Sequence, residues 1–356
     1  MSDWEEIFGE GIGNLTLSRV DDVSDPDDLD MRLNQTFALL ASSILRRWSD
    51  TDVWPNYEKD DIGTVFITSE HATALVVVDR GKAAIVLFSG LARRLLQFAA
   101  LYFVGWHQDG EDDAQETYSE FLDDIWPSLA DVWREHGLNE SSWSFAHNMF
   151  LQMLEYVVQH ELAHIDRGHI ERQAGQDTRQ YLSESEALSA HIAGDKAIRN
   201  REFEADVWAV QLHLEDLLED ADWSEQPQEV TFDYLRATVA AWMMVLMALD
   251  TDSSIAASKR SSHPAPVHRA MMVDEAFLDG IGNAFGFEWD NIREFLDGVW
   301  VNVSGVAERA KLAKGRWWGE STHRMGQVEF GKILEEFRAY FSNRPPPARL
   351  SDASIN

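Results

Sequence analysis

The sequence predicts an α+β fold that is mainly helical. Two segments, 143–172 and 199–219, carry apolar residues at the three-to-four-residue spacing of amphipathic helices. Upstream of both, short apolar or β-branched runs at 64–67, 74–78 and 83–89 are separated by turn-forming residues, which indicates a small β-sheet. With 45% hydrophobic residues, 14 Trp and 18 Phe among 356 residues, the chain can bury a substantial core.

We divide the chain into four regions. Residues 1–60 form an acidic, helical N-terminal extension, and residues 61–280 form the core that contains the sheet and the two helices. Further helical patterning defines a C-terminal region at 281–343, and a flexible tail follows at 344–356. An acidic insertion at 106–142 interrupts the core; a solvated helical excursion is the favoured interpretation, and a lid or a docking site for a basic partner is the alternative.

The first long helix carries the sequence His160-Glu161-Leu162-Ala163-His164. Four helical residues turn about 40° beyond one full revolution, so both imidazoles lie on one face and are able to bind one metal. A catalytic zinc ion takes three protein ligands and keeps one position open for water, whose proton a neighbouring carboxylate accepts. We therefore expect one Zn²⁺ per chain on His160 and His164, with Glu161 as the general base. A core helix with two stacked histidines is the alternative.

The second helix supplies the predicted third ligand. Glu202 and Asp206 are also four residues apart, so we assign Glu202 to the metal and Asp206 to a hydrogen bond that orients a ligand histidine. Glu204 lies about 200° around the helix from Glu202 and is excluded from the same metal. His169 is rotated by about 140° from His164 if the first helix continues, so we leave it structural.

Three motifs in this order resemble those of the gluzincin metallopeptidases, and among them the HtpX-like endopeptidases. They are the two-histidine segment 159–169, the Glu-Phe-Glu-Ala-Asp segment 202–206, and the segment 262–269, in which His-Pro is followed by Arg. The chain is also loosely similar to the Lit-type phage-exclusion peptidases, which cleave an intracellular protein. The resemblance implies a zincin-type catalytic helix pair with the small upstream sheet bordering the substrate cleft.

Further roles follow from the resemblance alone. It makes His263 a donor to the oxyanion formed during peptide hydrolysis, with a loop histidine before a turn proline as the alternative. It makes Arg269 an anchor that holds its loop through a carboxylate. The segment 82–91 resembles the strand that borders the cleft, so Phe88 and Ser89 are predicted to bind substrate; an ordinary core strand is the alternative.

Composition excludes several classes of function. A net charge of −32, from 62 acidic and 30 basic residues, disfavours nucleic-acid and anionic-lipid partners. The most apolar run, 237–249, is too short to span a membrane and is expected to be a buried helix behind the metal site. Residues 1–10 lack the pattern of a signal peptide, so we expect a cytoplasmic protein. The Asp-rich, Lys-poor surface suits a high-salt cytoplasm or an ordinary, moderately acidic one.

The expected activity is that of a zinc-dependent endopeptidase that hydrolyses peptide bonds of cytoplasmic protein substrates through metal-activated water. The chain contains 0 Cys, which excludes a cysteine nucleophile and disulfides. The alternative is a non-catalytic or toxin-like protein-binding module that retains a structural zinc site. The sequence does not determine the oligomeric state.

Overall fold

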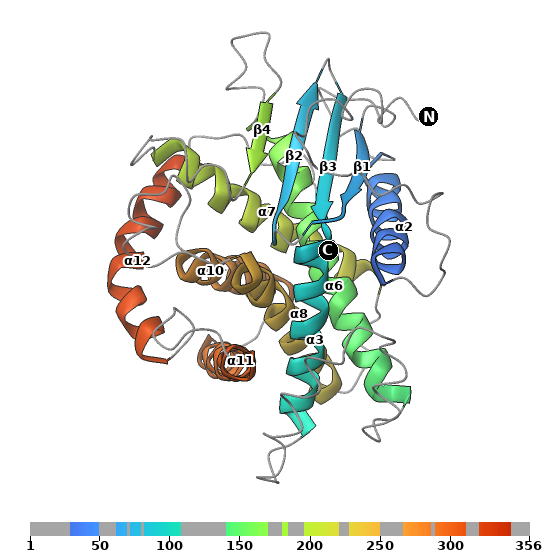
Figure 1. The fold of residues 1–356 in the computed structure, drawn as a ribbon. Helices are drawn as coiled ribbons and strands as arrows, with labels where there is room; N and C mark the ends of the chain where they lie inside the picture. Colours follow the sequence, from blue (N-terminus) through green and yellow to red (C-terminus); the bar gives the residue numbers. More distant parts are fainter. Residues whose placement is uncertain are drawn as a thin grey trace.

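The structure is a computed structural model, shown in Figure 1. It describes residues 29–49, 62–69, 72–79, 82–107, 140–169, 180–183, 196–220, 228–249, 266–285, 289–310 and 320–342. Most of the predicted extension 1–60, most of the acidic insertion 106–142, the tail 344–356 and His263 lie outside these residues.

The sheet has four strands in the order β1-β3-β2-β4. Their bounds are β1 Ile62–Ile67, β2 Ala74–Asp79, β3 Lys82–Phe88 and β4 Gln180–Ser183. β3 pairs parallel with β1 and antiparallel with β2, and β2 also pairs antiparallel with β4. The three predicted strands are confirmed to within about two residues. β4 was missed because four residues, Gln-Tyr-Leu-Ser, carry too little periodicity to indicate a strand without the pairing partner.

The central strand β3 is apolar from Ala83 to Phe88 because both of its faces are covered. Ile85 and Leu87 point into the main core, and Val86 and Phe88 belong to a second apolar cluster on the opposite face. This two-sided burial explains why the segment shows no alternation of apolar and polar residues.

Eight helices are described, and they make up most of the described chain. They are α2 Leu29–Ser49, α3 Ser89–His107, α6 Glu140–Asp166, α7 Lys196–Asp220, α8 Gln228–Leu249, α10 Pro266–Phe285, α11 Trp289–Arg309 and α12 Glu320–Phe341. The predicted α+β, mainly helical class is confirmed. Figure 1 shows the sheet at one end of the molecule, with α6, α3 and α8 extending away from it.

Helix α6 lies at the centre of this arrangement. It packs against α7, α3, α8 and α2, and it also contacts strands β2 and β3. Its buried side chains, among them Met153, Leu154 and Val158, are therefore not confined to one stripe. The polar side chains of its last turns are consequently enclosed by other elements rather than exposed to solvent.

Helix α8 contains the apolar run 237–249, which is buried, as predicted; Val239 to Ala248 are all at most 1% exposed. It packs against α6, α10 and α11. Among the described helices, none is both long enough and apolar enough to cross a membrane.

One helix end differs from the sequence prediction. The first long helix stops at Asp166, although its apolar pattern suggested continuation towards residue 172. Gly168 explains this difference, since its φ of 61° is incompatible with a continuing right-handed helix.

Candidate metal centre

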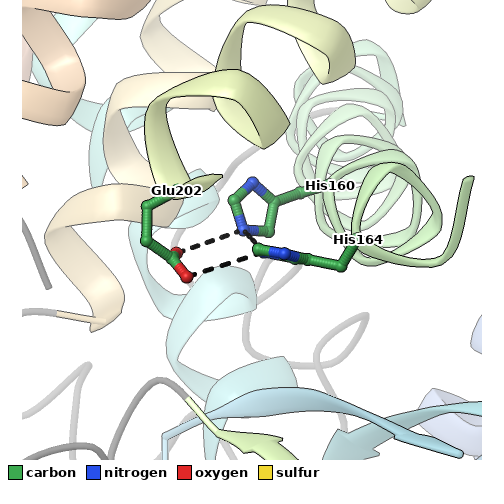
Figure 2. Close-up of side chains that lie close together, drawn as sticks. All are labelled: His160, His164 and Glu202. Atoms are coloured by element: carbon green, nitrogen blue, oxygen red, sulfur yellow. Dashed lines mark hydrogen bonds and ion pairs between the residues drawn. The ribbon is translucent and has the colours of Figure 1, made fainter. Parts of the chain in front are cut away.

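Two helices bring three buried polar side chains to one point. His160 and His164 project from α6 and Glu202 projects from α7 towards them (Figure 2). The three are 3%, 1% and 0% exposed. One ligand atom from each lies within 4.8 Å of the other two, and among the described residues this is the one group of at least three such side chains with this spacing.

The distances between the ligand atoms suit a small divalent cation. The two Nε2 atoms are 3.1 Å apart, and each lies 3.7 Å from an oxygen of Glu202. Zinc bonds of about 2.0–2.1 Å in a tetrahedral arrangement place ligand atoms about 3.3 Å apart, which lies between the observed values. Two imidazole nitrogens and one carboxylate form a donor set that zinc favours, so these residues fit the metal.

The helical geometry of α6 and α7 produces this convergence. His160 and His164 are one turn apart on α6, and Glu202 and Asp206 are one turn apart on α7. Because α6 and α7 pack against each other, the two pairs face one another across the contact.

Asp206 holds the far side of the His160 ring. Its Oδ1 lies 3.0 Å from His160 Nδ1, so an Nδ1–H donor on that ring leaves the Nε2 lone pair directed at the metal position. Tyr156 donates its hydroxyl to the same Oδ1 at 2.9 Å. Arg269 on α10 donates Nε and Nη2 to the two Asp206 oxygens at 2.8 Å each. The predicted orienting aspartate and the predicted anchoring arginine therefore bind each other directly.

The ionisation of these groups reflects burial and the neighbouring charges. Burial alone raises the pKa of Asp206, but the Arg269 guanidinium and His160 outweigh it and hold that pKa below its usual range. Burial disfavours charge on His160, yet Asp206 and Glu202 raise its pKa to about 10. Burial, together with His160 and His169, lowers the pKa of His164 well below its usual value, although Glu202 opposes this. These shifts favour a protonated His160 and a neutral His164.

The opposite nitrogen of His164 also has a partner. His169 Nδ1 lies 2.9 Å from His164 Nδ1, and His169 Nε2 lies 3.1 Å from Glu204 Oε2. We predicted a structural role for His169 because, in a helix that continued past Asp166, its side chain would point away from the metal. Gly168 was the available signal for the opposite result, since glycine commonly ends a helix by reversing the chain. Glu204 binds Arg167, His169 and Tyr340 and is not a member of the metal group.

Glu161 follows His160 on α6 and is also buried, at 2% exposure. On a helix its side chain is rotated by about 60° from that of His164 and about 100° from that of His160, which leaves it beside the two-histidine face. Its assignment as the general base stays a prediction.

Phe88 and Ser89 lie where strand β3 passes into helix α3, and they are 4% and 1% exposed. Phe88 pairs with Ile67 of β1, and its backbone N–H donates to the Thr73 carbonyl at 3.2 Å. The Ser89 hydroxyl donates to the Ser69 carbonyl at 3.0 Å. β3 is an inner strand, so its backbone groups already bond to neighbouring strands; the outer strands of the described sheet are β1 and β4. The predicted role of these two residues in substrate binding stays a prediction.

A family model described as Peptidase U49 matches residues 114–273. The matched segment contains the histidine pair, Glu202, Asp206 and Arg269 and covers under half of the 356-residue chain. This similarity supports a peptidase acting on protein substrates. No curated protein and no solved structure matches the chain.

Proposed function

We propose that this protein is a zinc-dependent endopeptidase, of the gluzincin type, that hydrolyses peptide bonds of cytoplasmic proteins. The observation that carries the proposal is the buried group of His160, His164 and Glu202, whose ligand atoms have the spacing of a zinc site. The similarity to a peptidase family over the segment that contains this group agrees with it.

The distribution of charge supports a dication at this point. Asp206 forms a close pair with Arg269, and Glu204 forms a close pair with Arg167 at 2.7 Å. The Glu202 oxygens lie farther from their cationic neighbours, with Arg269 Nη1 at 3.8 Å. Burying an ionised carboxylate is costly unless an opposite charge compensates it. The buried Glu202 carboxylate lies 3.7 Å from each imidazole, so a metal ion held by these three side chains would supply that charge.

Zinc held by these three residues would act as a Lewis acid that acidifies a water and polarises a peptide carbonyl. The Glu161 carboxylate accepts a proton from the attacking water, whose oxygen adds to the carbonyl carbon. Glu161 then passes that proton to the amide nitrogen as the carbon–nitrogen bond breaks, which yields a carboxylic acid and an amine. No covalent bond between enzyme and substrate is required.

The assignments of His263, Phe88 and Ser89 rest on the resemblance to gluzincins. We assign His263 to stabilisation of the oxyanion, where a well-placed donor typically contributes about 3 kcal/mol. We assign Phe88 and Ser89 to the substrate cleft. We assign Arg269 to holding Asp206, because its two hydrogen bonds to that residue occupy one edge of the guanidinium.

The test compares Glu161→Gln with Glu155→Gln. Both residues lie on α6, and Glu155 binds Arg47 at 2.9 Å, outside the metal group. We expect the purified wild-type chain to contain one zinc and to cleave casein. Loss of a general base should slow cleavage by Glu161→Gln by about 10²- to 10⁴-fold with zinc retained, whereas Glu155→Gln should cleave normally.

Two outcomes would contradict the proposal. A wild-type chain that binds no zinc would refute the predicted metal site. A Glu161→Gln variant that cleaves at the wild-type rate would refute the role of Glu161 as general base. If the chain holds zinc but cleaves no protein, and its biological effect survives Glu161→Gln, the alternative of a protein-binding module with structural zinc is supported.

A further inference from the structure

The end of helix α6 turns the chain back on itself. The backbone N–H of His169 donates to the His164 carbonyl at 3.0 Å, and the N–H of Gly168 donates to the Ile165 carbonyl at 3.1 Å. With Gly168 at a φ of 61°, these are the two hydrogen bonds of a Schellman motif. The reversal brings the His169 ring against the His164 ring, with centroids 4.9 Å apart.

A hydrogen-bonded chain follows from this contact. His164 Nδ1 is 2.9 Å from His169 Nδ1, and His169 Nε2 is 3.1 Å from Glu204 Oε2. All three side chains are at most 1% exposed. The chain thus joins a predicted metal ligand on α6 to a carboxylate on α7 through buried groups alone.

Glu204 sets the direction of these hydrogen bonds. Its Oε1 accepts from Arg167 Nε at 2.7 Å, and its Oε2 accepts from the Tyr340 hydroxyl at 3.1 Å. A carboxylate beside a guanidinium is ionised and has only acceptor oxygens, so the Nε2 of His169 must carry the proton that it shares with Glu204.

The tautomer of His169 then determines the tautomer of His164, the predicted metal ligand. A neutral His169 protonated on Nε2 has a lone pair on Nδ1, and this lone pair accepts a hydrogen bond from Nδ1–H of His164. His164 protonated on Nδ1 keeps its Nε2 lone pair free to face His160 and Glu202. In the opposite tautomer the proton would sit on Nε2 and block coordination.

We propose that His169 and Glu204 are positioning residues that fix the tautomer and ring orientation of His164, an inference that rests on the metal site of the proposed function. Asp206 does the same for His160 from the other side. Tyr340 extends the arrangement to α12, so the C-terminal helix supports the metal centre through Glu204. The ring nitrogen facing away from the metal is thus oriented by a carboxylate in both ligands: Asp206 contacts His160 directly, and Glu204 contacts His164 through His169.

The test measures metal binding rather than peptidase activity. Phenylalanine replaces the imidazole of His169 by a ring of similar shape without nitrogen atoms. His213→Phe is the matched control, because His213 is also buried, at 1% exposure, and its Nδ1 accepts from Trp242 outside the metal group. Zinc affinity is measured by competition with a chelator, and the visible spectrum of the cobalt-substituted protein reports the coordination geometry.

We expect His169→Phe to weaken zinc binding by about 10- to 100-fold and to shift or broaden the cobalt bands. His213→Phe should leave both unchanged. His169→Gln, whose amide offers an acceptor and a donor, should recover part of the affinity. If His169→Phe does not fold, Glu204→Gln provides the second test with the same expected loss.

Two results would overturn the inference, and they are distinguishable from each other. If the wild-type chain binds neither zinc nor cobalt, both the metal site and this inference are wrong. If the wild-type chain binds zinc, and the folded His169→Phe or Glu204→Gln variant has the same zinc affinity and cobalt spectrum, the positioning role is wrong. The proposed peptidase function is unaffected by that second result.

Discussion

Replacing Arg269 with methionine tests whether the buried charges of the centre depend on one guanidinium. Arg269 donates two hydrogen bonds of 2.8 Å to Asp206, and the side chains are 5% and 0% exposed. Methionine keeps most of the aliphatic volume and removes the charge. Asp206 would then be buried beside Glu202 without its guanidinium partner.

Breaking one partner of a buried ion pair costs about 3–5 kcal/mol, because the remaining charge is left uncompensated. The unfolding entropy of a chain of 356 residues, at roughly 2.1 cal/mol/K per residue, is about 0.75 kcal/mol/K. We therefore expect Arg269→Met to lower the unfolding midpoint by about 4–7 °C.

The control is Arg338→Met, since Arg338 pairs with Glu275 at 3.2 Å with side-chain exposures of 62% and 33%. Exposed pairs contribute about 0–1 kcal/mol, so this variant should lose about 1 °C or less. Thermal unfolding is followed by circular dichroism with a chelator present, so that changes in metal binding do not contribute. Adding Asp206→Asn to Arg269→Met should restore part of the loss, because the buried charge is removed.

The reasoning would be refuted if Arg269→Met and Arg338→Met unfolded at the same temperature. It would also be refuted if the double variant were less stable than Arg269→Met alone. Either result would mean that the Asp206 charge is compensated by other groups.

Three further substitutions give independent checks. Burial raises the pKa of Asp274 well above its usual range although Trp300 donates to it at 2.7 Å, so its contribution to stability is full at low pH and is lost as pH rises through the raised pKa. The unfolding midpoint of Asp274→Asn relative to wild type should therefore increase from pH 4 to pH 8, and a difference independent of pH would contradict this. Gly298→Ala in α11 should stabilise by about 0.5–1 kcal/mol in urea unfolding, because its added Cβ meets nothing within 4 Å. Gly280→Ala should gain less, because its Cβ would lie 2.9 Å from Leu214 Cδ1; equal gains would show that Leu214 moves freely.

The sequence alone was sufficient for features that depend on neighbouring residues. The one-turn spacing of His160 and His164, and of Glu202 and Asp206, defines two faces on two helices because helix geometry is local. The runs 64–67, 74–78 and 83–89 likewise indicated strands through their own β-branched and apolar residues.

Tertiary packing decided which of these faces meet and what supports them. His169 reaches His164 only because the chain reverses at Gly168, which a rotation calculated for a continuous helix cannot anticipate. Glu204 gains Arg167 and Tyr340 as partners, the second 136 residues farther along the chain. β4 is a strand through its pairing with β2 rather than through its composition. The periodicity of a segment determines which face of its helix or strand a side chain occupies. Hydrogen bonds between distant segments depend instead on how the elements pack together, and this packing is determined by the whole core.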